Sequence, residues 1–308
     1  MNNSSHERDR EAVSSAIEAL LVQRNPRGMA SLRAQLVPGY MQRAAETLLP
    51  IRGPILIGTG FPVGDTYETD GPAGALALYH CLESLGAEPV LVCGKPLSER
   101  LGSGFRVLDI AVGDRGGRIT GDSFAAVRLR EGRREGDPEI STRRALARLK
   151  PEAVISIERP GLNAEGRYTN MRGEDITERC ACFDHFLALA ACPTIAIGDG
   201  GNEIGMGNLQ AAVAELDIIP AVTRCDELLV ADVSNWGAYG LIAMIGYIAG
   251  QDTLADVTPR DYLEFLCARG SVDGVTRENT PTEDGFDAAI GEGIIAELRR
   301  ITGFGAQA

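Results

Sequence analysis

Short apolar runs recur along the middle of the chain, and segments with helical periodicity separate several of them. The runs are rich in β-branched residues and cover residues 54–59, 89–93, 107–111, 153–157, 194–197 and 228–233. The helical segments are 72–86, 141–149, 176–191 and 236–250. Strands that alternate with helices build parallel sheets with helices on both faces. The alternation therefore predicts an α/β fold with a doubly wound, mostly parallel sheet.

The segments around this alternation differ from it. Residues 8–24 and 28–48 carry apolar side chains at helical spacing, and Pro38 is expected to kink or split the second helix. Residues 113–150 are rich in Gly, Arg and Glu, which favours a hairpin or excursion followed by an exposed helix. The tail, residues 255–308, is expected to hold two helices around a polar loop. We predict an N-terminal helical arm (1–50) and a single α/β domain (51–308).

The charge balance argues against several kinds of partner. The 308 residues include 43 acidic and 30 basic side chains, a net charge of -13. Nucleic acids and anionic membranes would repel such a chain, and no apolar run approaches the ~20 residues of a membrane span. The N-terminus lacks the apolar segment of a signal peptide, and the seven cysteines are scattered through apolar surroundings. We expect a cytoplasmic protein with a small-molecule partner, no nucleic acid and no membrane contact; homo-oligomerisation stays open.

Five glycines and three polar side chains follow the run 194–197 within ten residues. The stretch 198–207 reads GDGGNEIGMG and includes Asp199, Asn202 and Glu203. Glycine at this density is tolerated mainly where φ is positive or the backbone approaches another group closely. A tight turn between a strand and a helix would explain one or two of these glycines, but not five that alternate with acids. The stretch therefore indicates a ligand or metal site.

Polar loops follow other predicted strands, and the carboxyl ends of parallel strands meet at one edge of a sheet. Glu68 and Asp70 come after the first strand, although Asp70 can also serve simply as a helix cap. Glu158 and Arg159 end a buried strand, where charges are costly unless they are paired or bound, so a structural ion pair is the alternative to a substrate contact. Residues 234–236, Ser-Asn-Trp, follow the last strand; such residues more often cap a helix or anchor a core.

The familiar nucleotide and hydrolase motifs are absent. The glycine loops beginning at residues 58 and 198 both lack the third glycine of G-x-G-x-x-G, and no Walker A or G-x-S-x-G sequence occurs. The three histidines are not spaced as zinc ligands. We therefore expect no nucleotide cofactor. Carboxylates among glycines are typical instead of hard divalent cations, of which Mn²⁺ and Mg²⁺ are the first candidates.

Taken together, these loops resemble the D-glutamate cyclase family. The matching strings are TGFPVGDTYETDGPAGALAL (59–78), ISIERPGLNAEGRYTNMRG (155–173), IGDGGNEIGMGN (197–208) and VSNWGAYGL (233–241), with a weaker match in SVDGVTRE (271–278). In animals this domain forms the C-terminal half of a larger mitochondrial protein, and we expect a stand-alone, bacterial-type homologue without the additional N-terminal domain. The resemblance implies a lyase that converts D-glutamate to 5-oxo-D-proline with loss of water.

The resemblance also implies roles for the residues of these loops. A divalent metal would polarise the γ-carboxyl group of the substrate and stabilise the oxyanion that forms on it. The expected metal ligands are Glu68, Asp70, Asp199 and Glu203. The expected catalytic residues are Glu158, as general base, with Asp199 and Glu203. The expected substrate-binding residues are Arg159 or Arg172 for the α-carboxylate, with Asn170, Asn202, Asn235, Gly200 and Gly201 as further contacts.

Two other functions remain open on the sequence. The same acidic loops would serve a metal-dependent hydrolase of a small phosphorylated or acyl substrate. A non-catalytic protein that binds an amino acid or nucleotide is the other alternative. The density of acids argues against that last function, because capture of an anionic ligand favours basic residues.

Overall fold

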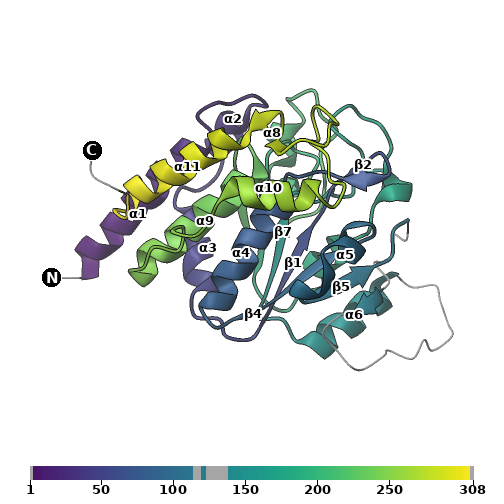
Figure 1. Cartoon of the computed structure of the whole chain (residues 1–308), viewed down its shortest axis with the longest axis horizontal. Helices are drawn as coiled ribbons and strands as arrows, with labels where there is room; N and C mark the ends of the chain where they lie inside the picture. The colour runs from purple at the N-terminus through teal and green to yellow at the C-terminus, as the bar shows by residue number, and fades with distance from the viewer. Residues whose placement is uncertain (1–2, 114–118, 123–137, 306–308) are drawn as a thin grey trace.

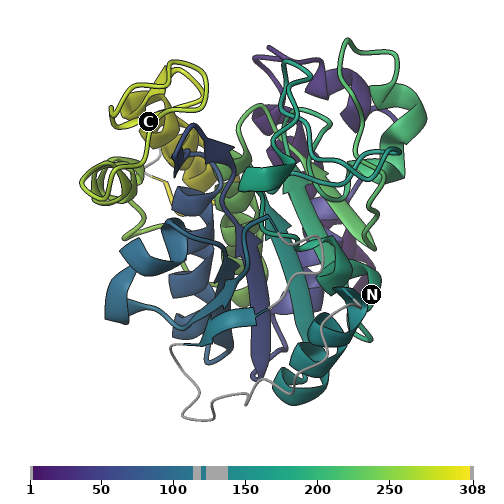
Figure 2. The same cartoon turned by 90° about the vertical axis from the view of Figure 1, so that its right-hand side faces the viewer.

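A seven-stranded sheet lies at the centre of the molecule (Figures 1 and 2). The computed structural model describes residues 3–113, 119–122 and 138–305. Within them the strand order is β6-β5-β4-β1-β7-β8-β9, with β6 antiparallel and the other six strands parallel. The prediction of a doubly wound, mostly parallel α/β fold is confirmed.

Most strands of this sheet coincide with the predicted apolar runs. The strands are β1 (Pro54–Thr59), β4 (Glu88–Cys93), β5 (Val107–Ile110), β6 (Ile119–Asp122), β7 (Ala153–Ile157), β8 (Thr194–Gly198) and β9 (Glu227–Val230). Two small hairpins lie outside the sheet: β2 (Pro62–Val63) with β3 (Thr66–Tyr67), and β10 (Thr282–Glu283) with β11 (Phe286–Asp287). The last predicted strand ends three residues early, because the chain leaves the sheet after Val230 to begin the next helix.

Helices cover both faces of the sheet. They are α1 (Asn3–Leu21), α2 (Met29–Arg33), α3 (Tyr40–Leu48), α4 (Pro72–Ser84), α5 (Leu97–Arg100), α6 (Pro138–Leu149), α7 (Asp184–Ala188), α8 (Gln210–Val213), α9 (Ser234–Ala249), α10 (Pro259–Cys267) and α11 (Ala288–Ile301). Short 3-10 turns cover Gly102–Gly104, Thr177–Arg179 and Met206–Leu209. The C-terminal helices, yellow in both views, lie on the side of the molecule away from α6.

Side chains alternate between the two faces of the buried strands, as strand geometry requires. Ile55 and Ile57 of β1 join the larger hydrophobic cluster, which also holds Leu21 of α1 and Leu48 of α3. Leu56, between them, joins the smaller cluster under α6 and α7. Helices α1 and α3 also pack directly against α9. The N-terminal helices are therefore part of the main core.

Two segments refine or correct the sequence predictions. The predicted helix 176–191 is wrong: this segment holds only a 3-10 turn and the five-residue α7. Ala181 forms an isolated β-bridge with Val112, and Cys180 and Cys182 are buried in a small cluster beside Tyr168, so tertiary packing overrides the helical period. The predicted split of the second helical segment is confirmed, since α2 and α3 lie on either side of Pro38.

The remaining expectations are met in part. Strand β6, which pairs antiparallel with β5, and helix α6 lie within the predicted excursion, whereas residues 114–118 and 123–137 lie outside the described residues. Cys81, Cys93, Cys180 and Cys182 are buried, and all seven cysteines are unpaired. Within the described part of the chain, no helix has the length and apolar character needed to cross a membrane.

The strand order creates one place suited to a ligand. From β1 the chain first moves outward to β4 and β5, and then crosses back to build β7, β8 and β9 on the other side of β1. The loops that follow β1 and β7 therefore leave the sheet in opposite directions. In open α/β sheets ligands bind in the crevice that such a divergence opens at the carboxyl ends of the strands.

Candidate active site

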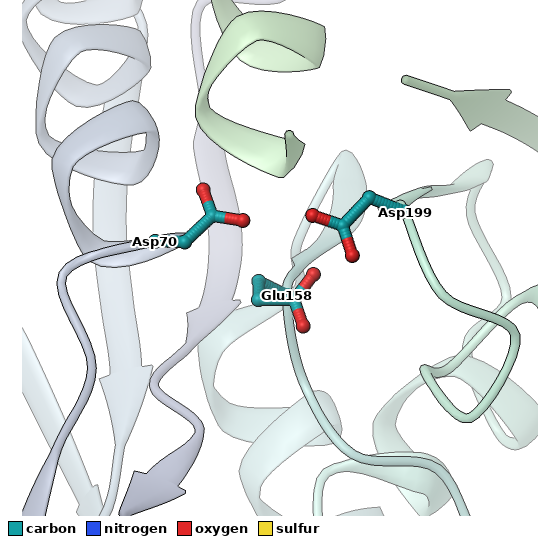
Figure 3. A group of neighbouring side chains, drawn as sticks. All are labelled: Asp70, Glu158 and Asp199. Carbon is teal, nitrogen blue, oxygen red and sulfur yellow. The ribbon is translucent and has the colours of Figure 1, made fainter. Parts of the chain in front are cut away.

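Three of the predicted acids meet at this crevice. Asp70 lies between β3 and α4, Glu158 directly follows β7, and Asp199 directly follows β8. Figure 3 shows their carboxylates pointing toward one another, and one oxygen of each lies within 4.8 Å of the others. All three residues are buried. We call this group the acid cluster.

The backbone at Glu158 is held in an unusual conformation. Its φ is 46°, in the left-handed region that non-glycine residues seldom adopt, at a cost of about 1–3 kcal/mol. Gly71 makes room for it: a Cβ at Gly71 would lie 2.4 Å from the Cβ of Glu158, and Gly71 itself has a φ of 83°. The glycine before α4 is therefore required by close approach as well as by its own dihedral angle.

The N-terminus of α9 points at the acid cluster. The Ser234 amide donates to Asp70 Oδ2 at 3.0 Å and to Asp199 Oδ2 at 3.1 Å, and the Asn235 amide donates to Asp70 Oδ1 at 2.7 Å. The Ser234 hydroxyl donates to Glu158 Oε2 at 2.5 Å. The free N–H groups and the dipole of a helix N-terminus stabilise negative charge. Helix α9 therefore stabilises the carboxylates of the cluster.

Asp70 is a helix cap, but not of the helix that follows it in sequence. The N-cap position of α4 is Gly71, whereas Asp70 accepts from the first amides of α9. The alternative interpretation of residues 234–236 is confirmed for Trp236, which is buried in the core and donates to Glu283 Oε1 at 2.6 Å. The N-cap of α9 is Val233, without a side-chain hydrogen bond, so Ser234 does not cap its own helix.

Two further charged residues reach the cluster from distant parts of the chain. The Nη1 atom of Arg27, in the segment between α1 and α2, lies 2.5 Å from Asp199 Oδ1 and 2.7 Å from Asp284 Oδ2. Asp284 sits between β10 and β11 with a φ of 52°. Sequence reasoning missed both: Asp284 lies in the polar loop of the tail, and nothing in the sequence marks Arg27.

Burial and mutual repulsion perturb these acids strongly. Burial, followed by the charge of Asp284, raises the pKa of Asp70 to about 7, and burial with the nearby Asp199 raises the pKa of Asp284 to about 8. The pKa values of Glu158 and Asp199 are raised well above their usual range, again mainly by burial, although Arg27 opposes the shift at Asp199. Bringing more positive charge to the cluster would therefore be favourable.

A cavity of about 340 Å³ opens beside the cluster, within the size range of small-molecule sites. The charged side chains at its inner end are Arg27, Glu68, Glu158, Asp199 and Asp284. Arg172, Arg179 and Arg277 are exposed and line it further out. Glu68 and Arg172 therefore lie at the cavity as predicted residues, and Asn170 lines it too.

Other predicted residues are turned toward the protein instead. Arg159 is 2% exposed, donates to the Thr59 carbonyl at 2.7 Å and to the Ala181 carbonyl, and stacks near the Phe183 ring, outside the lining of this cavity. Asn235 Oδ1 accepts from the amides of Gly71 and Gly74. The hydrogen bonds of both side chains are structural: Arg159 lies just after the carboxyl end of β7, and Asn235 joins the start of α9 to the start of α4.

The glycine-rich loop after β8 is held by its own side chains. Glu203 Oε2 accepts from the Gly201 amide at 2.6 Å, and Asn202 donates to the Thr169 carbonyl at 2.9 Å. A Cβ at Gly200 would meet Glu203 Oε1 at 2.6 Å. Among the described residues, Glu203 and Glu68 lie outside the group of acids whose oxygens come within 4.8 Å of one another. The loop places Asp199 in the acid cluster, whereas Glu203 stabilises the loop backbone through its bond to the Gly201 amide.

The comparison with known proteins agrees with the resemblance. Residues 17–299 match the family described as D-glutamate cyclase-like, C-terminal. The chain belongs to this family. Human mitochondrial D-glutamate cyclase is 31% identical to the chain over 209 residues, which cover 61% of this chain and 32% of the human protein. The matched part is thus about a third of the length of the human protein. The family match over residues 17–299 includes the loops of the acid cluster.

Proposed function

We propose that the protein converts D-glutamate to 5-oxo-D-proline and water at the acid cluster, with the help of a divalent cation. The observation that carries the proposal is the meeting of Asp70, Glu158 and Asp199 at the crevice of the sheet, beside a cavity of about 340 Å³. Membership of the D-glutamate cyclase-like family and the name of the human relative support the choice of reaction.

The reaction sets clear demands on the site. The α-ammonium group must lose two protons, one before and one after its nitrogen forms a bond to Cδ. One oxygen of the γ-carboxylate must take up two protons and leave as water as its bond to Cδ breaks. The γ-carboxylate is a poor electrophile until its charge is offset, and negative charge grows on it as the ring closes. The site therefore needs a proton acceptor, a positive group near the γ-carboxylate and protection from bulk water.

The acid cluster fits a hard divalent cation such as Mn²⁺ or Mg²⁺. Its donors are carboxylate oxygens, which these cations prefer, and its buried, mutually repelling acids would be stabilised by added positive charge. Asp70, Glu158 and Asp199 would hold the ion. When bound, it would supply Lewis acidity to the γ-carboxyl group.

The remaining residues of the cavity would complete the chemistry. Glu68 is 7% exposed, lines the cavity and lies outside the acid cluster. We therefore propose that Glu68 is the base that accepts a proton from the substrate's ammonium group. Burial raises the pKa of Glu68 well above its usual value, which makes it a stronger base than an exposed glutamate. The N-terminus of α9, through the amide of Ser234, would stabilise negative charge at the cluster throughout.

The direct test is an assay of the purified protein after removal of metal. D-glutamate and L-glutamate are incubated with the protein in the presence and absence of Mn²⁺ or Mg²⁺, and 5-oxoproline is followed by chromatography. We expect product from D-glutamate when the cation is present, and none when Glu68→Gln replaces the proposed base. A folded protein that forms no 5-oxoproline with either cation would overturn the proposed function.

A further inference from the structure

Arg27 is held by only one edge of its guanidinium group. Both carboxylates that contact it, Asp199 and Asp284, meet the same nitrogen, Nη1, at 2.5 and 2.7 Å. Within the described part of the chain, neither Nε nor Nη2 of Arg27 has a hydrogen-bond partner. The side chain is 20% exposed and lines the cavity. A second edge, with two donors side by side, is therefore available to a ligand.

That edge matches the shape of a carboxylate. The Nε and Nη2 donors of an arginine lie in one plane and form two parallel hydrogen bonds to the two oxygens of a carboxylate. The contacts with Asp199 and Asp284 fix the orientation of the plane before a ligand arrives. Preorganisation of this kind reduces the side-chain entropy that binding would otherwise cost.

The other arginines near the cavity are less suited to this role. Arg159 is committed to the backbone carbonyls of Thr59 and Ala181. Arg172 and Arg277 are exposed at the outer part of the cavity, where solvent weakens their pull on an anion. An anionic substrate that enters among the inner acids meets repulsion there, and Arg27 is the basic side chain that lies among them in the described residues.

We propose that Arg27 binds the α-carboxylate of the substrate through Nε and Nη2, while Nη1 stays on Asp199 and Asp284. This inference rests on the proposed function and deepens it. The γ-carboxylate is the group that loses an oxygen, so it must lie at the acid cluster, and the α-carboxylate is left for the arginine. Arg27 thus sets the orientation of the substrate and selects amino acids that carry a free α-carboxylate.

The test compares D-glutamate with D-isoglutamine, whose α-carboxylate is replaced by an amide. Each compound is titrated calorimetrically into the full chain in chelator, so that binding is measured without turnover. The variants are Arg27→Gln and Arg27→Lys, and the matched control is Arg43→Lys, which makes the same change at an ion pair with Glu227 away from the cavity. Arg27→Lys keeps a cation for the two carboxylates but removes the second edge, so it separates ligand binding from a structural role.

We expect the unaltered protein to bind D-glutamate at least tenfold more tightly than D-isoglutamine. Both Arg27 variants should lose at least tenfold in affinity for D-glutamate and lose the preference, while Arg43→Lys keeps both. Equal affinity of the unaltered protein for the two compounds, no binding of D-glutamate, or unchanged binding by folded Arg27→Lys would each overturn the inference. A protein that binds D-glutamate through Arg27 but forms no 5-oxoproline with cation contradicts the proposed function alone.

Discussion

Glu18 and Asp199 are both 1% exposed and burial raises the pKa of both, yet their hydrogen-bond donors differ. Glu18 Oε1 accepts hydrogen bonds from the Ser14 hydroxyl at 2.8 Å, the Gly39 amide at 3.0 Å and the Met41 amide at 3.3 Å. One carboxylate with several donors of its own joins α1 to the start of α3. A buried acid of this kind is part of the scaffold.

Asp199 has to share its donors with other acids. The Ser234 amide serves both Asp199 and Asp70, and Nη1 of Arg27 serves both Asp199 and Asp284. Because several carboxylates share few hydrogen-bond donors, their mutual repulsion is not fully offset and destabilises the folded protein. A bound cation would relieve this repulsion. Burial alone therefore does not mark a functional acid, and we propose that crowding of several carboxylates around shared donors does. Substitutions at the two places should therefore have opposite consequences.

The largest effect is expected on turnover. Asp199→Asn removes a charge from the proposed cation site, and 5-oxoproline formation should fall by about a thousandfold, the order of loss seen when a preorganised electrostatic group is removed. Stability in urea should stay the same or rise, because repulsion within the acid cluster is relieved. Chromatographic rates and urea midpoints check this pair of results. Full turnover by Asp199→Asn would remove the distinction between the two places.

Glu18→Met should do the reverse. The Gly39 and Met41 amides and the Ser14 hydroxyl would lose their buried acceptor, which is expected to cost on the order of 3 kcal/mol of unfolding free energy. Turnover per folded molecule should change less than twofold, since α1 and α3 do not contribute side chains to the cavity. Urea unfolding measures the loss of stability, and 5-oxoproline assays at one D-glutamate concentration measure the turnover of the folded protein. A loss of turnover as large as that of Asp199→Asn would show that Glu18 is not merely structural.

Divalent cation should stabilise the protein through the acid cluster. At a Mn²⁺ concentration a hundredfold above its dissociation constant, we expect a gain of about 2.7 kcal/mol. Glu18→Met should keep this gain, because its change lies outside the cluster, and Asp199→Asn should lose most of it. Thermal melts with and without Mn²⁺ measure the difference. Equal stabilisation of Asp199→Asn and the unaltered protein would place the cation elsewhere.

The pH dependence of the metal-free protein should show the crowding directly. In the folded state the pKa of Asp70 is raised to about 7 and that of Asp284 to about 8, both above the unfolded values. The folded state therefore holds protons that the unfolded state has lost, and stability should fall by on the order of 2 kcal/mol between pH 6 and 8. Urea titrations in chelator measure this slope. Mn²⁺ should flatten it, and a stability that rises with pH would contradict the account.

Local sequence was enough to predict the sheet and the meeting of its acidic loops at one edge, but not which acids come together there. Asp70, Glu158 and Asp199 sit in loops after apolar runs, and parallel strands bring the ends of such runs to one edge, so their meeting follows from topology. The prediction of Asp70 and Asp199 as metal ligands is compatible with this geometry and stays a prediction. Glu158, expected as the base, lies inside the cluster, and Glu203 lies outside it.

The partners of these residues depend on contacts that no local pattern encodes. Arg27 reaches Asp199 across 172 residues of sequence, from a segment whose own composition is unremarkable for a loop. Arg159 donates hydrogen bonds to the carbonyls of Thr59 and Ala181, which come together only in the folded chain. Tertiary packing also overrides the helical pattern of segment 176–191, where Cys180 has an extended backbone and is buried beside Tyr168.

Binding of a divalent cation by the acid cluster is tested most directly by a crystal structure of the protein with Mn²⁺ and 5-oxo-D-proline. Anomalous scattering identifies the ion in such crystals. We expect a Mn²⁺ peak within coordination distance of Asp70, Glu158 and Asp199, with the product in the adjoining cavity. A Mn²⁺ peak at other residues, with Asp70, Glu158 and Asp199 still bound to the N-terminus of α9 and to Arg27, would contradict the proposed cation site.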